Sequence, residues 1–436
     1  MRILVGNDLE SDGVQRPPDT NLKRSAFSNR ILYFARPGDV LVLPAEPDEA
    51  FVGFVLGFLG LRTDDVVLRV APPGRFNRAF LDPLCVDDAL AGLDITAAEV
   101  SEVFVLWPNP DIAAMAARMG WEDKYPGHRL IAGGGGAFVN SKAAFRAIGN
   151  GIGVSLPEGR VCHQRDEAAL VLSQLLHAHG GAVLKQDLNA AGAGNRVVVA
   201  GDEVPSPAQS GHRGVDTLPE RPSVDDIERC LARNWAWASS GDRRSVVIEQ
   251  YVPDAETAYF EFFLGDTVSD PKVGRLLYSK GRLIREDTAS VEVFPRHLRD
   301  EAQVIAETYH GLGYRGYLSA DAVLTSGDQG YWTEVNARVT GSTHLYGVLK
   351  VIASRHSSGQ ERRVTQFQAP TGWLISSTAD FLDLAKAAGV LYDPAVGSGV
   401  VPVMPIDGPG FLFACIYVHE EQLQDQWNRL ERRATS

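Results

Sequence analysis

Two apolar runs near the C-terminal third of the chain, at 317–325 and 331–337, carry acidic side chains at positions that a β-hairpin would bring together. A turn centred at 327 and 328 sets Asp321 directly opposite Glu334, and opposed Cβ atoms in a hairpin lie about 5 Å apart. Two carboxylates at that spacing repel each other unless a cation lies between them. The sequence therefore predicts a hairpin whose two strands share a cation site.

The residues that follow Glu334 complete a candidate magnesium site. Because strand side chains alternate between two faces, Asn336 and Arg338 project from the same face as Glu334. Two carboxylates and a carboxamide form an oxygen-only ligand set, which suits Mg²⁺, or alternatively Mn²⁺, with phosphate oxygens completing the shell. Arg338 could then reach a phosphate or a bound carboxylate. The alternative hypothesis is a solvated hairpin face with its acids exposed to water.

A second signal is a lysine on a short strand that leads into a glycine-bearing turn. Lys185 lies on the strand expected at 182–186, and the turn at 189–196 contains Gly192 and Gly194. Glycines let backbone amides approach phosphate oxygens, and a lysine supplies charge without demanding a fixed geometry. The turn is not a Walker A loop, because no Gly-Lys-Ser/Thr occurs there. The alternative is a hairpin with a loose tip and a solvated lysine.

A third signal is the apolar strand at 246–252, which ends in a polar turn. Backbone groups at Glu249, Gln250 and Val252 could hydrogen-bond to the edge of an adenine ring. Glu256, seven residues after Glu249, could bind both ribose hydroxyls. An acidic loop after a strand is also a common surface feature, so this segment alone indicates little.

Taken in this order, the segments resemble the ATP-grasp superfamily of ligases. The spacings of 3 and 7 at the hinge and of 13 and 2 at the metal set are similar to those of D-alanine–D-alanine-type ligases. The resemblance adds a cation at the start of the central domain, here Lys142, with Arg146 as the alternate. It implies an ATP site and a magnesium site, with Arg338 as the catalytic phosphate- or substrate-binding arginine. The implied nucleotide-binding residues are Lys142, Lys185, Gly192, Gly194, Glu249, Gln250, Val252 and Glu256, and the implied metal ligands are Asp321, Glu334 and Asn336.

The same resemblance implies a multidomain protein of α/β and α+β class. Two α+β subdomains would clasp ATP in an ATP-grasp core at 131–363, preceded by a Rossmann-like domain at 1–130 and followed by a small α+β domain at 364–436. Alternating short apolar runs and helical patterns over the first 130 residues independently predict an α/β domain with a largely parallel sheet. The glycine run at 133–136 is expected to be a flexible connector or a tight turn, and 202–222 a mobile loop.

The chemistry implied by the resemblance is ATP-dependent carboxylate–amine ligation. A substrate acid is activated as an acyl phosphate, an amine attacks it, and ADP and phosphate are released. Within the superfamily the chain is most similar to the pheganomycin-type peptide ligases, which implies a guanidinoacetic acid derivative, a peptide amine and a role in antibiotic biosynthesis. The alternatives are another dipeptide or amino-acid ligase, or a nucleotide-binding scaffold without turnover.

The substrate pocket is expected where the N-terminal domain meets 276–290 and the residues after the metal strand. Gly341, Ser342 and His344 are predicted to line it, with His344 as a ligand or a base.

An arginine that many relatives keep two residues before the metal aspartate is replaced here by Ser319. Its function would pass to Arg315, Arg285 or Arg282, and Arg285 is included among the predicted substrate residues.

The composition of the chain limits the classes of partner that it is expected to bind. With 42 Lys and Arg against 55 Asp and Glu, the net charge of −13 opposes non-specific nucleic-acid binding. No apolar run is long enough to cross a bilayer, and residues 1–6 do not begin a signal peptide. The four cysteines lack metal-ligand spacing, which indicates free thiols. These features predict a cytoplasmic enzyme whose partners are a small carboxylic acid and a peptide or amino-acid amine, and a homodimer is compatible with them.

Overall fold

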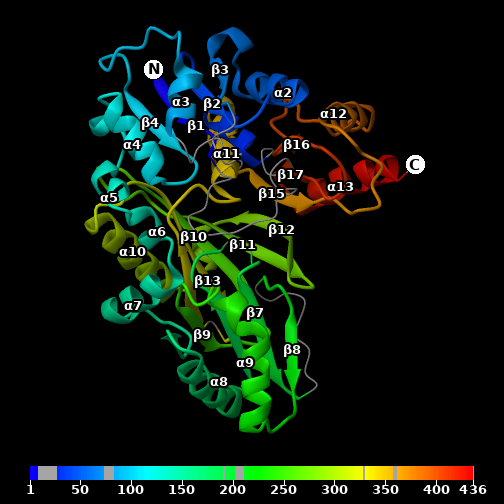
Figure 1. Cartoon of the computed structure of the whole chain (residues 1–436). Coiled ribbons are helices and arrows are strands. Elements are labelled where there is room, and N and C mark those ends of the chain that lie inside the picture. The colour runs from blue at the N-terminus through cyan, green and yellow to red at the C-terminus, as the bar shows by residue number, and fades with distance from the viewer. Residues whose placement is uncertain are drawn as a thin grey trace.

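The computed structural model describes residues 1–7, 27–72, 83–189, 192–201, 211–327, 329–356 and 361–435. Within these residues the strands form three sheets, of four, five and eight strands. Figure 1 shows the four-stranded sheet at the top, the five-stranded sheet at the bottom and the eight-stranded sheet running between them.

The N-terminal sheet is parallel, with the order β3-β2-β1-β4, as the alternating pattern predicts. Its strands are β1 (Arg2–Val5), β2 (Val40–Leu43), β3 (Val67–Val70) and β4 (Glu102–Val105). The helical elements are η1 (Asn29–Phe34), α2 (Glu49–Leu59), η2 (Thr63–Asp65), α3 (Pro83–Leu90), α4 (Pro110–Arg118) and η3 (Glu122–Lys124).

The connector or tight turn expected at 133–136 is found only in part, because Gly133 and Gly134 form a turn between two short helices, α5 (His128–Ala132) and α6 (Gly135–Val139), whereas Gly135 and Gly136 belong to α6. A Cβ at Gly136 would lie 2.8 Å from the carbonyl oxygen of Pro108, and one at Gly135 would lie 2.5 Å from Leu130. The glycines are therefore needed for close packing against the N-terminal domain.

The five-stranded sheet has the order β5-β9-β6-β7-β8 and forms one half of the predicted clasp. Its elements are β5 (Gly159–Cys162), α8 (Arg165–His179), β6 (Gly181–Gln186), β7 (Asn195–Ala200), β8 (Val215–Leu218), α9 (Val224–Ala238) and β9 (Val246–Gln250). Helices α8 and α9 cover one face with a shared apolar core, at the bottom of Figure 1. A capping box formed by Ser223 and Asp226 opens α9. Part of the expected loop at 202–222 is the strand β8, and 202–210 lies outside the described residues.

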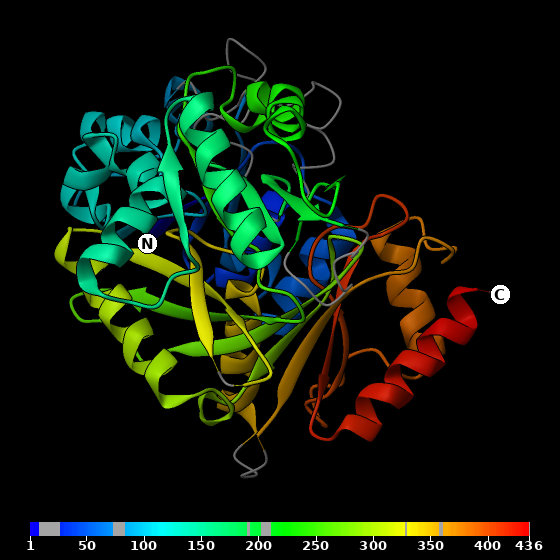
Figure 2. The ribbon, with the colours of Figure 1, turned by 90° about the horizontal axis from the view of Figure 1, so that it is seen from below.

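The eight-stranded sheet has the order β14-β13-β10-β11-β12-β15-β17-β16, and its neighbouring strands are antiparallel. The strands are β10 (Glu256–Leu264), β11 (Lys272–Ser279), β12 (Arg282–Ala289), β13 (Gly316–Leu324), β14 (Gly330–Asn336), β15 (Arg363–Gln368), β16 (Gly399–Pro402) and β17 (Leu412–Tyr417). Around them lie α7 (Lys142–Ile152), η4 (Val291–Val293), α10 (Arg296–Gly311), α11 (Thr343–Arg355), α12 (Thr378–Ala387) and α13 (Glu420–Ala434). Because β15 pairs with β12, the C-terminal segment extends the sheet of the core, and Figure 2 shows its orange and red helices beside that extension.

The two faces of the eight-stranded sheet differ in chemistry. On β10 and β13, Phe260, Phe262 and Ala320 enter the apolar core that contains α10. The intervening residues, such as Glu261 and Asp321, project from the opposite face, because strand side chains alternate. This second face carries the polar site.

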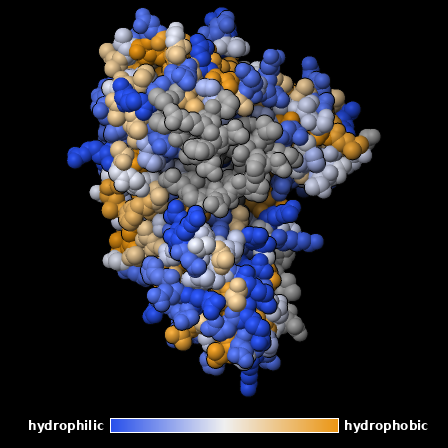
Figure 3. Space-filling view, in the orientation of Figure 1, coloured by the Kyte–Doolittle hydropathy of each residue, from blue (hydrophilic) through white to orange (hydrophobic). Residues whose placement is uncertain are grey.

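Surface polarity, the cysteines and the helices of the described residues agree with what the composition predicts. Hydrophilic residues dominate the face of the five-stranded subdomain that is visible in Figure 3. Cys85, Cys162, Cys230 and Cys415, which all lie in the described part of the chain, are buried and form no disulfide, as expected. Among the described helices, none combines the length and the apolar character needed to cross a bilayer.

Candidate active site

The hairpin of β13 and β14 brings the two predicted acids together, with Asp321 paired to Glu334. Nearer the tip the pairing shifts by one residue, so that Ala322 lies opposite Trp332. The extra residue is Thr333, whose hydroxyl donates to the carbonyl of Asp321 at 3.1 Å. The irregularity sits directly beside the acid pair and adjusts where the two carboxylates point.

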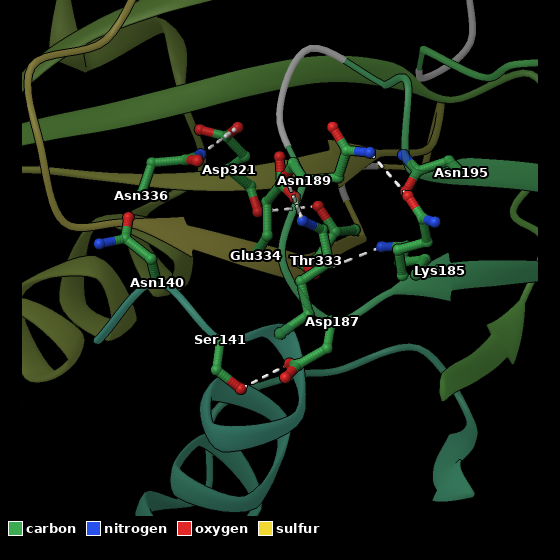
Figure 4. Close-up of polar contacts among 12 residues, drawn as sticks. Asn140, Ser141, Lys185, Asp187, Asn189, Asn195, Asp321, Thr333, Glu334 and Asn336 are labelled. Atoms are coloured by element: carbon green, nitrogen blue, oxygen red, sulfur yellow. Dashed lines mark hydrogen bonds and ion pairs between the residues drawn. The ribbon is translucent and has the colours of Figure 1, made fainter. Parts of the chain in front are cut away.

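The predicted metal ligands lie in contact with one another (Figure 4). The Asn336 amide donates to Asp321 Oδ2 at 3.1 Å, and the Ser319 hydroxyl donates to Asp321 Oδ1 at 3.1 Å. The ammonium of Lys142 lies 2.9 Å from Glu334 Oε2. Asp321, Glu334, Asn336 and Lys142 therefore form one polar cluster.

The two carboxylates have opposite pKa shifts. Burial and the charge of Glu334 raise the pKa of Asp321 well above its usual range. Burial would also raise the pKa of Glu334, but Lys142 and Lys185 outweigh it and lower that pKa to about 2. Two opposed carboxylates disfavour the ionisation of both, so the pKa of one rises while cations near the other lower its pKa.

This donor set fits a magnesium ion that shares its coordination shell with phosphates. The described residues contain no group of three or more His, Cys, Asp or Glu side chains able to hold a metal. The protein would therefore supply two carboxylates and one amide. Mg²⁺ commonly binds through one or two carboxylates and takes its remaining ligands from water and substrate phosphates.

Lys142 is held in place by the N-terminus of α7. Ser141 caps this helix by accepting from the Ala144 amide at 3.0 Å, a bond that serine commonly makes at a helix N-terminus. Asp187, which the sequence analysis missed, accepts from the Ser141 hydroxyl at 2.5 Å and from the Ala143 amide at 3.0 Å. Asp187 lies just after β6, so the cap also joins α7 to the glycine-bearing turn.

Glu249 is the centre of a buried ion cluster. Its carboxylate contacts the ammonium of Lys185 and lies 3.2 Å from Nη1 of Arg146. Lys185 also donates to the carbonyl of Thr333 at 3.3 Å, so it joins the five-stranded sheet to the metal hairpin. The structure thereby separates the two candidate cations of α7: Lys142 lies at Glu334, whereas Arg146 is engaged by Glu249.

The hinge residues Gln250 and Val252 line a narrow slot between the two sheets, with Val183 and Val323 on its walls. The slot has a volume of about 40 Å³, which is room for about three water molecules. The slot lies between the hinge strand and the metal hairpin, because Glu249 and Gln250 line it together with Asp321 and Glu334.

The two predicted glycines differ in position. Gly192 lines both the slot and the larger cleft, and its φ of 71° together with a Cβ that would lie 2.5 Å from Gly211 excludes other residues. Gly194 packs against Asn189 instead, because a Cβ there would lie 2.5 Å from that side chain. Gly192 is thus the one of the pair that the structure places at the site.

Glu256 is not brought to the slot. Its carboxylate is 63% exposed and lies 3.4 Å from Arg275 of the neighbouring strand β11. The next residue, Thr257, lines the slot instead. Glu256, the predicted ribose-binding acid, therefore lies one residue away from the position that lines the slot. Adjacent residues of a strand project from opposite faces of the sheet.

Arg338 is supported by the N-terminal domain. Its Nη2 donates to Asn336 Oδ1 at 2.7 Å, and its Cζ lies 4.2 Å from the ring centroid of Trp107. The side chain of Asn7 fixes Trp107 by bonding to its backbone amide and carbonyl at 3.0 and 2.7 Å. The sequence analysis missed Trp107, although an aromatic residue just beyond a parallel strand is a recognisable position for ligand contacts.

A cleft of about 1990 Å³ extends from the metal hairpin to the C-terminal strands. The structure places Gly341, Ser342 and His344 in its lining, as expected. Arg285 lies elsewhere, since its Nε bonds to Asp287 at 2.8 Å and its guanidinium stacks over Phe367. Its strand neighbour Glu286 lines the cleft instead.

Of the arginines considered as replacements at Ser319, the structure favours Arg282, which lines the cleft. Arg315 donates to the carbonyls of His310 and Tyr314, both at 2.8 Å, and lines a separate small pocket. Further basic residues of the cleft were missed by the sequence analysis, and they are Arg30, Arg213, Arg243, Arg244 and Lys280. A basic cleft in a protein of net charge −13 would concentrate anionic ligands.

His344 is poorly matched to the work of a general base. Its ring is 2% exposed and lies 5.6 Å from that of Tyr33. Burial and the nearby Arg30 lower the pKa of His344 to about 3. General bases work best with a pKa near the operating pH, so His344 is better suited to hydrogen bonding.

Comparison with known proteins gives the family of one domain and the fold of the whole. Residues 28–121 match the family model described as the Pre ATP-grasp domain. No curated protein matches the sequence significantly. Among solved structures, the ADP complex of PurK, an N5-carboxyaminoimidazole ribonucleotide synthetase, is similar with a TM-score of 0.55 and 11% identity, covering 100% of this chain and 97% of that one.

Two further solved structures are similar to this chain over most of its length. The biotin carboxylase domain of the Hydrogenobacter thermophilus 2-oxoglutarate carboxylase, in complex with MgADP, gives a TM-score of 0.57 at 12% identity over 99% of this chain and 89% of that one. An L-amino acid ligase from Bacillus licheniformis gives 0.52 at 14% identity over 93% of each chain. The chain therefore has the predicted ATP-grasp fold preceded by a Pre ATP-grasp domain.

Proposed function

We propose that this chain is an ATP- and magnesium-dependent ligase that joins a carboxylate to an amine and releases ADP and phosphate. The carrying observation is the partly buried set of Asp321, Glu334 and Asn336, which lies beside Lys142 and at the edge of the slot lined by the hinge residues. Two similar proteins were crystallised with ADP or MgADP, which supports a nucleotide at this position.

The residues of this chain would act by positioning charge. A magnesium ion at Asp321, Glu334 and Asn336, when bound, would neutralise the β- and γ-phosphates. Lys142 and Lys185 would offset the remaining negative charge. Arg338, which lies over the ring of Trp107, would stabilise the transferring phosphoryl group.

The bond changes in the proposed reaction are balanced. A substrate carboxylate oxygen bonds to the γ-phosphorus while the bond to the β–γ bridging oxygen breaks, which yields an acyl phosphate and ADP. The amine then attacks the acyl carbon, phosphate departs with the C–O electron pair, and the amine loses a proton. Closure of the cleft around the bound substrates would limit the access of water to the acyl phosphate.

Two substrate classes follow from different observations. The resemblance to pheganomycin-type peptide ligases favours a guanidinoacetic acid derivative joined to a peptide amine, in peptide natural-product biosynthesis. The structural likeness to the L-amino acid ligase favours two amino acids. A matrix of acids against free amino acids and peptides, followed by ADP release, separates these classes.

The decisive experiment measures ADP formation with hydroxylamine as the amine. Hydroxylamine converts an acyl phosphate into a hydroxamate, so the correct acid should yield hydroxamate and ADP in equal amounts, and only with Mg²⁺. ATP binding by calorimetry without ADP formation for any acid–amine pair would contradict the proposal and favour a scaffold.

Glu256→Gln is expected to change the KM for ATP by less than about twofold, because the carboxylate faces Arg275 and solvent. Steady-state kinetics with varied ATP checks this. A tenfold rise in KM would instead support the ribose-binding acid that the sequence predicts.

A further inference from the structure

A single buried carboxylate on β10 holds the short segment that follows the metal strand. The Oε2 atom of Glu261 accepts hydrogen bonds from the hydroxyls of Thr340, Ser342 and Thr343 at 2.9, 3.0 and 2.9 Å. Glu261 is 3% exposed, and hydrogen bonds to an ionised group are stronger than those between neutral groups. These three bonds therefore tie residues 340–343, which we call the wall segment, to the eight-stranded sheet.

The wall segment separates Glu261 from the cleft. Thr340, Gly341 and Ser342 line the cleft, and Glu261 is not among the described residues that do so. Its carboxylate reaches the wall segment from the strand behind it. Any effect of Glu261 on a molecule in the cleft would therefore pass through the wall segment.

The wall segment joins the proposed catalytic arginine to a helix. It begins two residues after Arg338, and α11 begins at its last residue, Thr343. From the N-terminal domain, Nη1 of Arg30 donates to the carbonyl of Thr340 at 2.9 Å. Glu261 provides the ties from the core sheet, so the position of the wall segment relative to that sheet depends on its carboxylate.

We propose that Glu261 is a positioning residue of the ligase, which holds the wall segment in the geometry that binds the carboxylate substrate. This inference rests on the proposed function and adds a residue that contacts neither substrate nor nucleotide. The acid is the substrate expected beside the wall segment, because Arg338 is the proposed contact of the phosphoryl group that the acid accepts. A segment that is ordered in advance does not have to be ordered when the substrate binds, and this saving strengthens binding.

The first test needs no substrate and measures hydrogen exchange of the backbone amides in the full chain with MgADP. Glu261→Leu replaces the acid by an apolar side chain and leaves three hydroxyls without their acceptor. The amides of the wall segment should then exchange at least about tenfold faster, while those of β9 keep their rates. Glu307→Gln, which changes an exposed acid on α10, should alter neither set. Equal exchange of the wall segment in Glu261→Leu and the wild-type chain overturns the inference.

A second pair of variants decides the question even where Glu261→Leu does not fold. Thr343 is 1% exposed, and its hydroxyl bonds to Glu261 and to the Thr340 amide. Thr343→Val keeps the shape of the side chain and removes the hydroxyl, whereas Thr343→Ser keeps the hydroxyl. Exchange in the wall segment should rise in Thr343→Val and return close to the wild-type rate in Thr343→Ser. Equal rates in these two variants would contradict the proposal.

The ligase assay separates positioning from a purely structural role. ADP formation is measured with hydroxylamine as the amine and with guanidinoacetate and L-alanine as the acids. The KM for the acid should rise about tenfold in Glu261→Leu, and the KM for ATP should stay within about twofold, because the slot of the hinge residues is a separate place. Glu261→Gln should give a smaller rise, since its amide oxygen still accepts from the hydroxyls without the charge.

The assay is run at about pH 8, above the value of about 7 to which burial raises the pKa of Glu261, so that the carboxylate is mostly ionised. A lower melting temperature with an unchanged KM for the acid in Glu261→Leu would overturn the positioning role. Absence of ADP formation by the wild-type chain with every acid of the matrix overturns the proposed function, and the exchange rates then still decide whether Glu261 holds the wall segment.

Discussion

Glu334→Gln is expected to lower magnesium-dependent ADP formation by about 10²–10³-fold, which corresponds to about 3–4 kcal/mol of transition-state stabilisation. The substitution keeps the shape of the side chain but removes the charge that opposes Asp321 across the hairpin. Asn336→Ala should act in the same direction, because the amide is the third proposed ligand. Both effects are measured as ADP release at varied magnesium concentration.

The matched control for this experiment is Glu307→Gln, an exposed acid on α10 whose loss should leave the rate unchanged. Thermal unfolding of each purified variant shows whether the fold is retained. Wild-type rates in folded Glu334→Gln or Asn336→Ala would rule out the assigned metal ligands.

Glu249→Ala is expected to lower the free energy of unfolding of the five-stranded subdomain by about 3–5 kcal/mol. The carboxylate is 3% exposed and is the shared partner of Lys185 and Arg146, so its removal leaves two buried cations facing each other. Because a chain of several domains need not unfold in one step, hydrogen exchange of the backbone amides of β9 is the better measurement.

The control for this variant is Glu158→Ala, which removes an acid that is 65% exposed and paired with His179. Exposed ion pairs contribute little to the free energy of unfolding. The backbone amides of β9 should therefore lose at most about 1 kcal/mol of protection against hydrogen exchange. Equal exchange in both variants would show that the buried cluster does not stabilise the subdomain.

Features that depend on residues close together in the chain could be predicted from the sequence. The pairing of Asp321 with Glu334 is a short-range contact, and the bulge at Thr333 preserves it although the tip pairs one residue differently. Helix caps at Ser141 and Ser223 are also local, because each side chain bonds to an amide three residues ahead. The parallel N-terminal sheet follows from the alternation of strands and helices.

Features that depend on which element covers a given face were decided by the tertiary structure. Strand periodicity separates Glu256 from Thr257 and Arg285 from Glu286, but it does not say which member of each pair is covered. The packing of the five-stranded sheet and of the C-terminal strands made Thr257 and Glu286 the inner residues.

Contacts between segments that are distant in the sequence were likewise decided by the tertiary structure. Arg338 stacks on Trp107, and Arg30 donates to the carbonyl of Thr340 at 2.9 Å across 310 residues of sequence. The sequence by itself determined the local geometry of the metal hairpin and the order of the elements around it. Only the folded chain decided which charges are buried together, because burial depends on how the sheets pack and not on the spacing of residues within a strand.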